Sequence, residues 1–319
     1  MRSMPKIKDE ISFLRSRVSR YRKLLIAGII LWIVFYLSGF LTGWWVIKGK
    51  LGSFPPVSSR TRLLVIAPHP DDETVMAGGL IQRVLENQGK VEIVYLTNGD
   101  GSRTTIIQED KKVDLSPTEF IALGETRIEE AAKAASILGV KKDKIFFLGF
   151  PDQGLTKIYN RNFSQADGIG ISATTKIDHV PYSEAYRPGQ AYYGSNLLND
   201  VKEIVIAFKP NIVVTGHPRD NHPDHRISFT IIEKLRSELD PHCKIYSSLT
   251  HFRGFPSPGG YLFPPKKLFG GDWLSLELYP PEIAVKKKAI EVHVSQYSRP
   301  QDKLLLDRFT SRNEIFEEE

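Results

Sequence analysis

The sequence predicts an α/β domain whose mostly parallel sheet is covered by helices on both faces, preceded by one N-terminal transmembrane helix. From residue 62 onward, short apolar runs alternate with segments of helical periodicity, which is typical of strands joined by crossover helices. Residues 24–47 form a stretch of 24 residues without a charge. We therefore expect a basic juxtamembrane segment at 1–23, a transmembrane helix at 24–47, a linker at 48–61 and a globular domain at 62–319.

The uncharged stretch has the length of a membrane anchor. A helix of 24 residues spans about 36 Å, and the hydrocarbon core of a bilayer is about 30 Å thick. Trp44 and Trp45 lie near its end, where an aromatic belt is expected. A buried core helix rarely runs this far without a charge, and a cleaved signal peptide has an apolar run of only about 7–15 residues. A retained single-pass anchor is the favoured interpretation.

The positive charge of the chain belongs to its N-terminal segment. The chain has 43 Lys and Arg against 37 Asp and Glu, but residues 1–62 contain twelve basic and two acidic residues. The remaining 257 residues contain 31 basic and 35 acidic residues, so nothing indicates a nucleic-acid-binding surface. Five Lys and Arg precede the anchor between residues 15 and 23, whereas two follow it before residue 51. This asymmetry predicts a cytoplasmic N-terminus and an extracytoplasmic globular domain.

An apolar stripe at helical spacing precedes the anchor and consists of Ile7, Ile11, Leu14, Val18 and Tyr21. Such a stripe could pair with the same helix of a second copy, but it covers only two heptads. A helix that lies at the membrane surface, or that extends the anchor, is the simpler expectation.

The globular part reads as strands and helices in alternation. The expected strands are at 63–67, 91–97, 144–148, 212–215 and 244–248, and the expected helices are at 73–87, 118–138, 197–208 and 226–239. This order is typical of a Rossmann-like sheet. In such sheets a ligand binds outside the carboxyl ends of the strands.

Two polar clusters fall at such strand ends. Residues 68–73 (PHPDDE) follow the strand at 63–67, and residues 217–225 (HPRDNHPDH) follow the strand at 212–215. About 150 residues separate the clusters in sequence, yet a parallel sheet would place both at one edge. For either cluster alone, a helix cap at Asp72 and surface histidines are the simpler explanation. The presence of two such clusters at matching strand ends favours a functional site over this simpler explanation.

These clusters offer imidazoles and carboxylates, which suit zinc or another divalent metal ion. Cys243 is the single cysteine, so the sequence excludes a disulfide framework and a thiolate zinc site. Two imidazoles and one carboxylate complete the ligand set of a catalytic zinc, a spare carboxylate can take a proton from water, and a further imidazolium can stabilise an oxyanion. The residues alone do not decide whether Asp71 or Asp72 is the ligand.

The same clusters carry a family resemblance. Residues 67–73 (APHPDDE) resemble the (A/H)HPDDE signature of the LmbE/PIG-L family of zinc-dependent de-N-acetylases, and residues 222–225 (HPDH) resemble its HxDH motif. Further similar positions are 97–100 (TNGD), 123–124, Arg127, Glu130, 138–139, 151–154 (PDQG, with an inserted Gln), Lys286, Ala289, His293, 295–296 and a last turn at 313–316. The resemblance covers about residues 62–317 and implies an amide-hydrolysing deacetylase domain.

The resemblance also implies roles for individual residues. It implies that His69, Asp72 and His225 bind zinc and that Asp71 is the general base. His222 would polarise the amide carbonyl and stabilise the oxyanion. These roles are expectations at this point.

The resemblance also suggests supporting or sugar-binding roles for four further residues. The resemblance places Asp224 behind a histidine, and Arg127, Asp152 and His293 near the sugar. As alternatives, Arg127 pairs with Glu129 or Glu130, Asp152 caps a turn, and His293 is structural. His179, His242 and His251 have no context in the sequence and read as surface or packing residues.

The family's substrates are N-acetylglucosamine conjugates, and two long irregular segments, 157–194 and 252–272, are candidate lids or binding loops. The leading expectation is a membrane-anchored zinc enzyme that removes the acetyl group of an N-acetylglucosamine-containing glycan or glycoconjugate. One alternative is another amide hydrolysis, such as cleavage of a thiol-sugar conjugate. The other alternative is a non-catalytic, surface-anchored carbohydrate-binding protein. The presence of both Asp71 and His222 argues against this alternative. A branch of the family that faces the cytosol would reverse the expected orientation.

Overall fold

The computed structural model describes residues 17–35, 37–38, 49–110, 114–256 and 260–319. The chain divides into two compact units, Met1–Leu51 and Gly52–Glu319. In the first unit, residues 17–35 are helical. Within the described ranges, no helix combines the length and the apolar character needed to cross a membrane. Residues 36 and 39–47 of the expected anchor, and Ile7, Ile11 and Leu14 of the apolar stripe, lie outside the described residues.

The second unit is built on one eight-stranded sheet with the strand order β1-β7-β8-β6-β5-β2-β3-β4. The strands are β1 (Gly52–Ser53), β2 (Arg62–Ala67), β3 (Lys90–Thr97), β4 (Ile145–Phe150), β5 (Ile212–Gly216), β6 (Lys244–Ser248), β7 (Trp273–Glu277) and β8 (Asn313–Glu318). Only β8 is antiparallel to its neighbours, β6 and β7. The five strands expected from the sequence are present, and the prediction of a mostly parallel sheet is confirmed.

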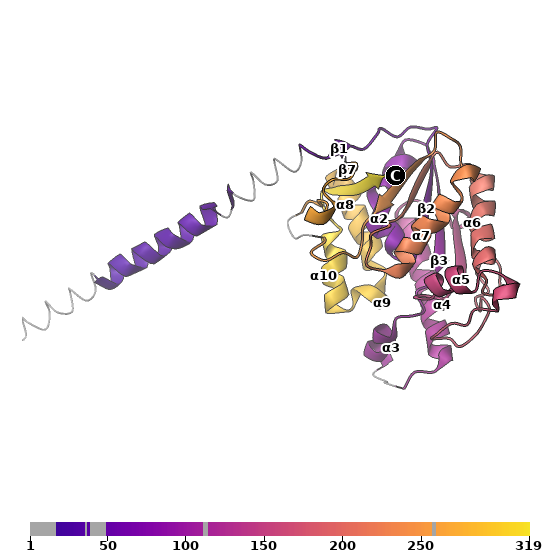
Figure 1. Cartoon of the computed structure of the whole chain (residues 1–319). Helices are drawn as coiled ribbons and strands as arrows, with labels where there is room; N and C mark the ends of the chain where they lie inside the picture. The colour runs from indigo at the N-terminus through magenta and orange to yellow at the C-terminus, as the bar shows by residue number, and fades with distance from the viewer. Residues whose placement is uncertain (1–16, 36, 39–48, 111–113, 257–259) are drawn as a thin grey trace, which may run out of the picture. The chain divides into compact units, whose positions relative to one another are not determined.

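Helices cover both faces of this sheet, as expected (Figure 1). The longer helices are α2 (Asp72–Glu86), α4 (Pro117–Ile137), α6 (Gly194–Phe208), α7 (Pro223–Lys234) and α8 (Pro280–Glu291), and the shorter ones are α3 (Arg103–Asp110), α5 (Leu155–Arg161), α9 (Val294–Tyr297) and α10 (Pro300–Arg308). Helix α8 packs on α2 and α4, whereas α5 packs on α6 and α7. Because both faces are covered, residues 63–67 of β2 have no exposed surface, which explains their unbroken apolar run.

Two elements differ from the expected boundaries. Strand β1 lies inside the expected linker and pairs with β7, and Phe54 then packs its ring against Tyr246 and Phe316 at centroid distances of 4.8 and 5.1 Å. The folded unit therefore begins before residue 62. The last turn expected at 313–316 is wrong, since these residues belong to β8, where Ile315 and Phe316 are buried.

Helix α2 is interrupted one turn after it begins. Ala77 has φ −143° and ψ 16°, which are not helical values. In an unbroken helix the Gly79 N–H would donate to the Val75 carbonyl. Here the Gly79 and Leu80 N–H groups donate to the carboxylate of Glu314, at 2.7 and 2.9 Å. The break therefore leaves a carbonyl without its usual partner.

A buried ion pair satisfies the backbone groups that this break leaves unpaired. The Lys286 ammonium donates to the Val75 carbonyl at 3.0 Å and to Glu314 Oε1 at 2.6 Å. The side chains of Lys286 and Glu314 are 0% and 1% exposed, so each charge is compensated by the other and by the backbone of α2. The pair joins α8 and β8 to the helix that carries the first polar cluster.

Lys286→Met should lower the free energy of unfolding by about 3–5 kcal/mol, because it leaves the Glu314 carboxylate buried without its counter-ion. Urea denaturation of the purified chain measures this change. Lys287→Met is the matched control: Lys287 is exposed on the same helix and lies 3.7 Å from Glu291, so its loss should cost about 1 kcal/mol or less. Equal midpoints for the two variants would contradict the role given to Lys286.

Candidate active site

The turn from β2 into α2 places three polar side chains side by side. Asp71 precedes the first residue of α2 and has φ 115°, a region that L residues rarely adopt. Its N–H donates to the Glu73 carboxylate at 3.1 Å, and the Thr97 N–H and hydroxyl both donate to the Pro68 carbonyl at 3.0 Å. These contacts hold the turn in a conformation that costs about 1–3 kcal/mol.

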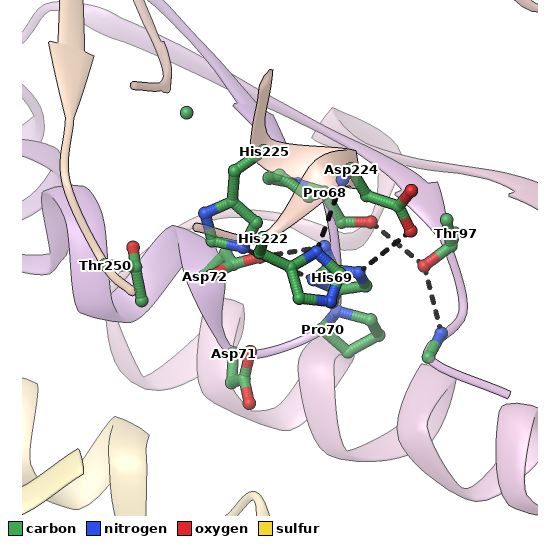
Figure 2. Close-up of polar contacts among 12 residues, drawn as sticks. Pro68, His69, Pro70, Asp71, Asp72, Thr97, His222, Asp224, His225 and Thr250 are labelled. Carbon is green, nitrogen blue, oxygen red and sulfur yellow. Dashed lines mark hydrogen bonds and ion pairs between the residues drawn. The ribbon is translucent and has the colours of Figure 1, made fainter. Parts of the chain in front are cut away.

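The imidazoles of His69 and His225 both approach one carboxylate oxygen of Asp72. Asp72 Oδ2 lies 3.0 Å from His69 Nδ1 and 3.2 Å from His225 Nε2. Figure 2 shows the imidazoles of His69, His222 and His225 grouped with the carboxylates of Asp72 and Asp224. The three residues that the resemblance implied as zinc ligands are thus brought together from the ends of β2 and β5.

These residues fit a divalent metal ion. His225 is fully buried, yet neither ring nitrogen makes a hydrogen bond within the described part of the chain, although carboxylate oxygens of Asp72 and Asp220 lie 3.2 and 3.4 Å away. One ligating atom from each of His69, His222 and His225 lies within 4.8 Å of the other two. Nitrogen and oxygen donors without thiols suit zinc. His222 thus brings a third imidazole next to the expected set.

The hydrogen bonds of His222 fix its tautomer. Its Nδ1 accepts the N–H of Asp224 at 3.3 Å, so in the neutral ring the proton is on Nε2. Burial, together with the nearby His69 and His225, lowers the pKa of His222 to about 3. The expectation of an imidazolium is therefore not supported, and a neutral ring that donates through Nε2 is the form the surroundings favour.

Asp71 is set for proton transfer. Burial raises its pKa to about 6, although the Arg127 guanidinium opposes this shift. A carboxylate with such a pKa can accept a proton near neutral pH and return it. Its position beside Asp72, at the edge of the group in Figure 2, fits the expected general base.

Arg127 reaches the turn rather than its neighbours on α4. Its guanidinium donates to the carbonyls of Pro70 and Gly99, the latter at 3.0 Å, and lies 3.4 Å from Asp71 Oδ2. Glu130 instead accepts from the N–H and hydroxyl of Ser295. The alternative pairing of Arg127 with Glu130 is therefore wrong, and Arg127 braces the carbonyl that precedes Asp71.

Asp224 and Asp152 both lie against His69. Their oxygens are 3.4 and 3.1 Å from His69 Nε2. Asp224 also accepts the N–H of Gln153 at 2.6 Å, and Asp152 accepts the N–H of Gly101 at 2.9 Å. Asp224 thus stands behind a histidine as expected. Asp152 caps a turn and also lines the cavity, and its expected role toward a sugar stays a prediction.

His293 is fully buried and its Nε2 lies 3.4 Å from Glu73 Oε1. It does not line the cavity. The expected position near the sugar is therefore not where the structure places it. His293 supports the Glu73 carboxylate that holds the N–H of Asp71.

A cavity of about 190 Å³ opens over these residues. It is smaller than the roughly 300–1,000 Å³ of typical ligand pockets, so a substrate larger than one sugar must extend beyond it. The walls come from both polar clusters, from the C-terminal helices and from residues between them. Beyond the two clusters, the lining consists of Val75, Ser102, Arg127, Asp152, Gln153, Thr250, His251, Gln296, Arg299, Asp302, Leu305, Leu306 and Phe309.

The two irregular segments contribute differently to this cavity. None of the lining residues comes from 157–194, whose Tyr182 and Tyr192 are buried, and the Tyr182 hydroxyl donates to Asp100 at 2.7 Å. The described residues of 157–194 therefore do not supply the binding loop expected of this segment at this cavity. In the second segment, Phe255 packs on the lining residue Phe309 at a centroid distance of 5.9 Å.

One site residue, His251, was not predicted from the sequence, and Asp220 was given no role of its own within the second polar cluster. His251 was read as a surface or packing residue, yet it lines the cavity beside His222 and His225. Asp220 is buried, and its Oδ2 lies 3.4 Å from His225 Nδ1. Both follow strand ends, β6 and β5, which was the only signal in the sequence that could have found them.

The family model for the PIG-L proteins, described as GlcNAc-PI de-N-acetylase, matches residues 64–235, more than half of the chain. The chain belongs to the PIG-L family. It is similar, at 29% identity over 185 residues, to a 1D-myo-inositol 2-acetamido-2-deoxy-alpha-D-glucopyranoside deacetylase of Mycobacterium sp. (strain KMS), covering 56% of this chain and 52% of that protein. It is also similar, at 27% identity over 174 residues, to a diacetylchitobiose deacetylase of Thermococcus kodakarensis, covering 54% of this chain and 47% of that protein. The chain spans about half the length of the curated relatives it matches.

Solved structures share the fold of this PIG-L chain. A deacetylase of teicoplanin biosynthesis superposes with a TM-score of 0.54 at 19% identity, over 81% of this chain and 97% of that one. The zinc-inhibited form of a teicoplanin deacetylase gives a TM-score of 0.52 at 17% identity over the same shares. At these identities the likeness shows the fold.

Gly99→Ala should disrupt the support of Asp71. Gly99 has φ +66°, and an added Cβ would clash with the Arg127 guanidinium. We expect a loss of about 10- to 100-fold in kcat as Arg127 is displaced, with a drop in melting temperature. Gly189→Ala is the matched control, since Gly189 has φ +75° and open space around it. Its backbone strain should cost stability alone, and equal activity losses in both variants would contradict the role of Arg127.

Proposed function

We propose that this PIG-L chain is a zinc-dependent hydrolase that removes the acetyl group from an N-acetylglucosamine-containing glycan or glycoconjugate and releases acetate. The observation that carries the proposal is the convergence of His69 Nδ1 and His225 Nε2 on one oxygen of Asp72, with Asp71 in the same cavity. The relatives whose names specify an acetamido sugar or diacetylchitobiose as the substrate support the substrate class.

His69, Asp72 and His225 would hold the metal. When bound there, zinc supplies Lewis acidity toward water and toward an amide carbonyl. Asp71 lies beside this set and takes the proton of the attacking water, for which its raised pKa suits it. Asp71 can then deliver the proton to the leaving amine nitrogen.

His222 stabilises the negative charge that develops on the amide oxygen. Its Nδ1 already accepts the Asp224 N–H, so its Nε2–H is the donor that remains for the substrate. Arg127 keeps its guanidinium on the Pro70 and Gly99 carbonyls, so it acts by holding Asp71 in place. In this mechanism neutral His222 stabilises the developing charge, and Asp71 transfers the proton.

We further propose that the N-terminal segment anchors the chain in a membrane, with the N-terminus in the cytoplasm and the enzyme domain outside. Two features support this proposal: residues 24–47 carry no charge, and apolar side chains of the helix at 17–35 are exposed, including Leu31, Trp32 and Phe35 at 69%, 67% and 80%. The greater number of Lys and Arg before residue 24 supports the orientation.

Removal of the metal should abolish activity. We expect that chelation, or His69→Ala, brings acetate release from N-acetylglucosamine conjugates to background and lowers the zinc content. Asp71→Asn should keep the zinc and lose about 10²–10⁴-fold in kcat. His179→Ala, in an exposed histidine outside the cavity, is the control and should behave as the wild type. A zinc-free enzyme that is insensitive to chelators would contradict the proposal.

The anchor is tested by fractionation. The full chain expressed in bacterial cells should sediment with membranes and resist extraction with carbonate, whereas the second unit alone, residues 52–319, should be soluble. A cysteine placed at the exposed Glu203 should react with an impermeant maleimide in intact spheroplasts. Labelling that occurs only after lysis would contradict the proposed orientation. A full chain that stays in the soluble fraction would contradict the proposed membrane anchor.

A further inference from the structure

Asp220 ties the loop after β5 to the loop after β6. This buried carboxylate accepts the N–H of His222 through Oδ1 at 2.8 Å. Through Oδ2 it accepts the N–H groups of Thr250 and His251, both at 2.9 Å. The Asn221 N–H in turn donates to the carbonyl of His251 at 2.7 Å. The backbone of His251 is therefore held as firmly as that of His222.

This arrangement brings a fourth imidazole into the cavity. The ring of His251 lies with its centroid 5.0 Å from that of His225 and 5.6 Å from that of His222. Within the described part of the chain the ring makes no hydrogen bond, and its nitrogens are not among the buried polar atoms. They are therefore open to a ligand.

Several charged groups around the cavity already have partners within the chain, and the Nε2–H of His222 is assigned to the amide oxygen. The Arg127 guanidinium donates to two backbone carbonyls. That of Arg299 donates to Gln296 at 2.6 Å and pairs with Asp302. His69 and His225 face Asp72. His251 thus combines a fixed backbone with an uncommitted side chain at the cavity wall.

We propose that His251 is a substrate-binding residue, which hydrogen-bonds a hydroxyl of the sugar next to the acetamide group. The inference rests on the proposed function and adds a specificity-determining residue to it. A neutral imidazole presents one donor and one acceptor, so it can pair with a hydroxyl in either sense. Among the described residues, His251 belongs to none of the clusters that could hold a metal ion, so we assign its ring to the substrate and not to the metal.

The test uses the zinc-loaded full chain with N,N′-diacetylchitobiose. His251→Ala should raise KM at least tenfold and leave kcat within about threefold, with unchanged zinc content, and His251→Asn should recover part of the loss. In the Asp71→Asn background, calorimetry should show the same weakening of N-acetylglucosamine binding. His242→Ala, in an exposed histidine near β6, is the control.

The outcomes separate this inference from the proposed function. A loss of zinc in His251→Ala would make the residue a metal ligand and overturn the inference, as would a KM and a Kd that stay within threefold of the parent. If the wild type releases no acetate from the disaccharide but His251→Ala still weakens sugar binding tenfold, the proposed function fails and the assignment of His251 stands. If the protein with His251 intact neither binds nor cleaves these sugars, both fail.

Discussion

The site depends on one backbone constraint, the turn that carries the chain from β2 into α2. Consecutive residues cannot all face one cavity from a regular strand or helix, and Asp71 at φ 115° is what allows His69, Asp71 and Asp72 to do so. The surrounding contacts counter this strain. The Glu73 carboxylate accepts the N–H of Asp71, and the Arg127 guanidinium donates to the Pro70 carbonyl. The repaired break in α2 lies one turn further on.

Carboxylates accompany the buried histidines throughout the molecule. His69 faces Asp72, Asp152 and Asp224, and other buried histidines face Asp220, Glu73 or Glu317. Such pairing lets imidazoles remain in a dry interior and fixes the direction of each ring. His222 differs, because it accepts from a backbone N–H and has no carboxylate in hydrogen-bonding contact within the described residues. This difference sets it apart as the neutral donor of the group.

Local patterning could predict the first two-thirds of the folded unit. The strands and helices between 62 and 248 have the apolar runs and periodicities that parallel sheets require, and the two polar clusters follow from their positions at strand ends. Strand β8, with four acidic or amide side chains in six positions, has no such pattern and is stabilised by its neighbours β6 and β7. The positive φ of Asp71 and the link from Asp220 to His251 depend on partners far apart or on backbone strain, which residue types alone do not reveal.

The strand directions also separate the point of attachment from the mouth of the cavity. Gly52 pairs with Leu274 near the start of β7, at the edge of the sheet where β2 to β6 begin, and the chain then crosses to β2. The side chains of the candidate site follow the opposite ends of these strands, about 20 Å away for a strand of six residues. The chain therefore enters the folded unit at the sheet edge opposite the one that carries the cavity, so a change at the entry strand and a change at the cavity rim act on separate ends of the sheet.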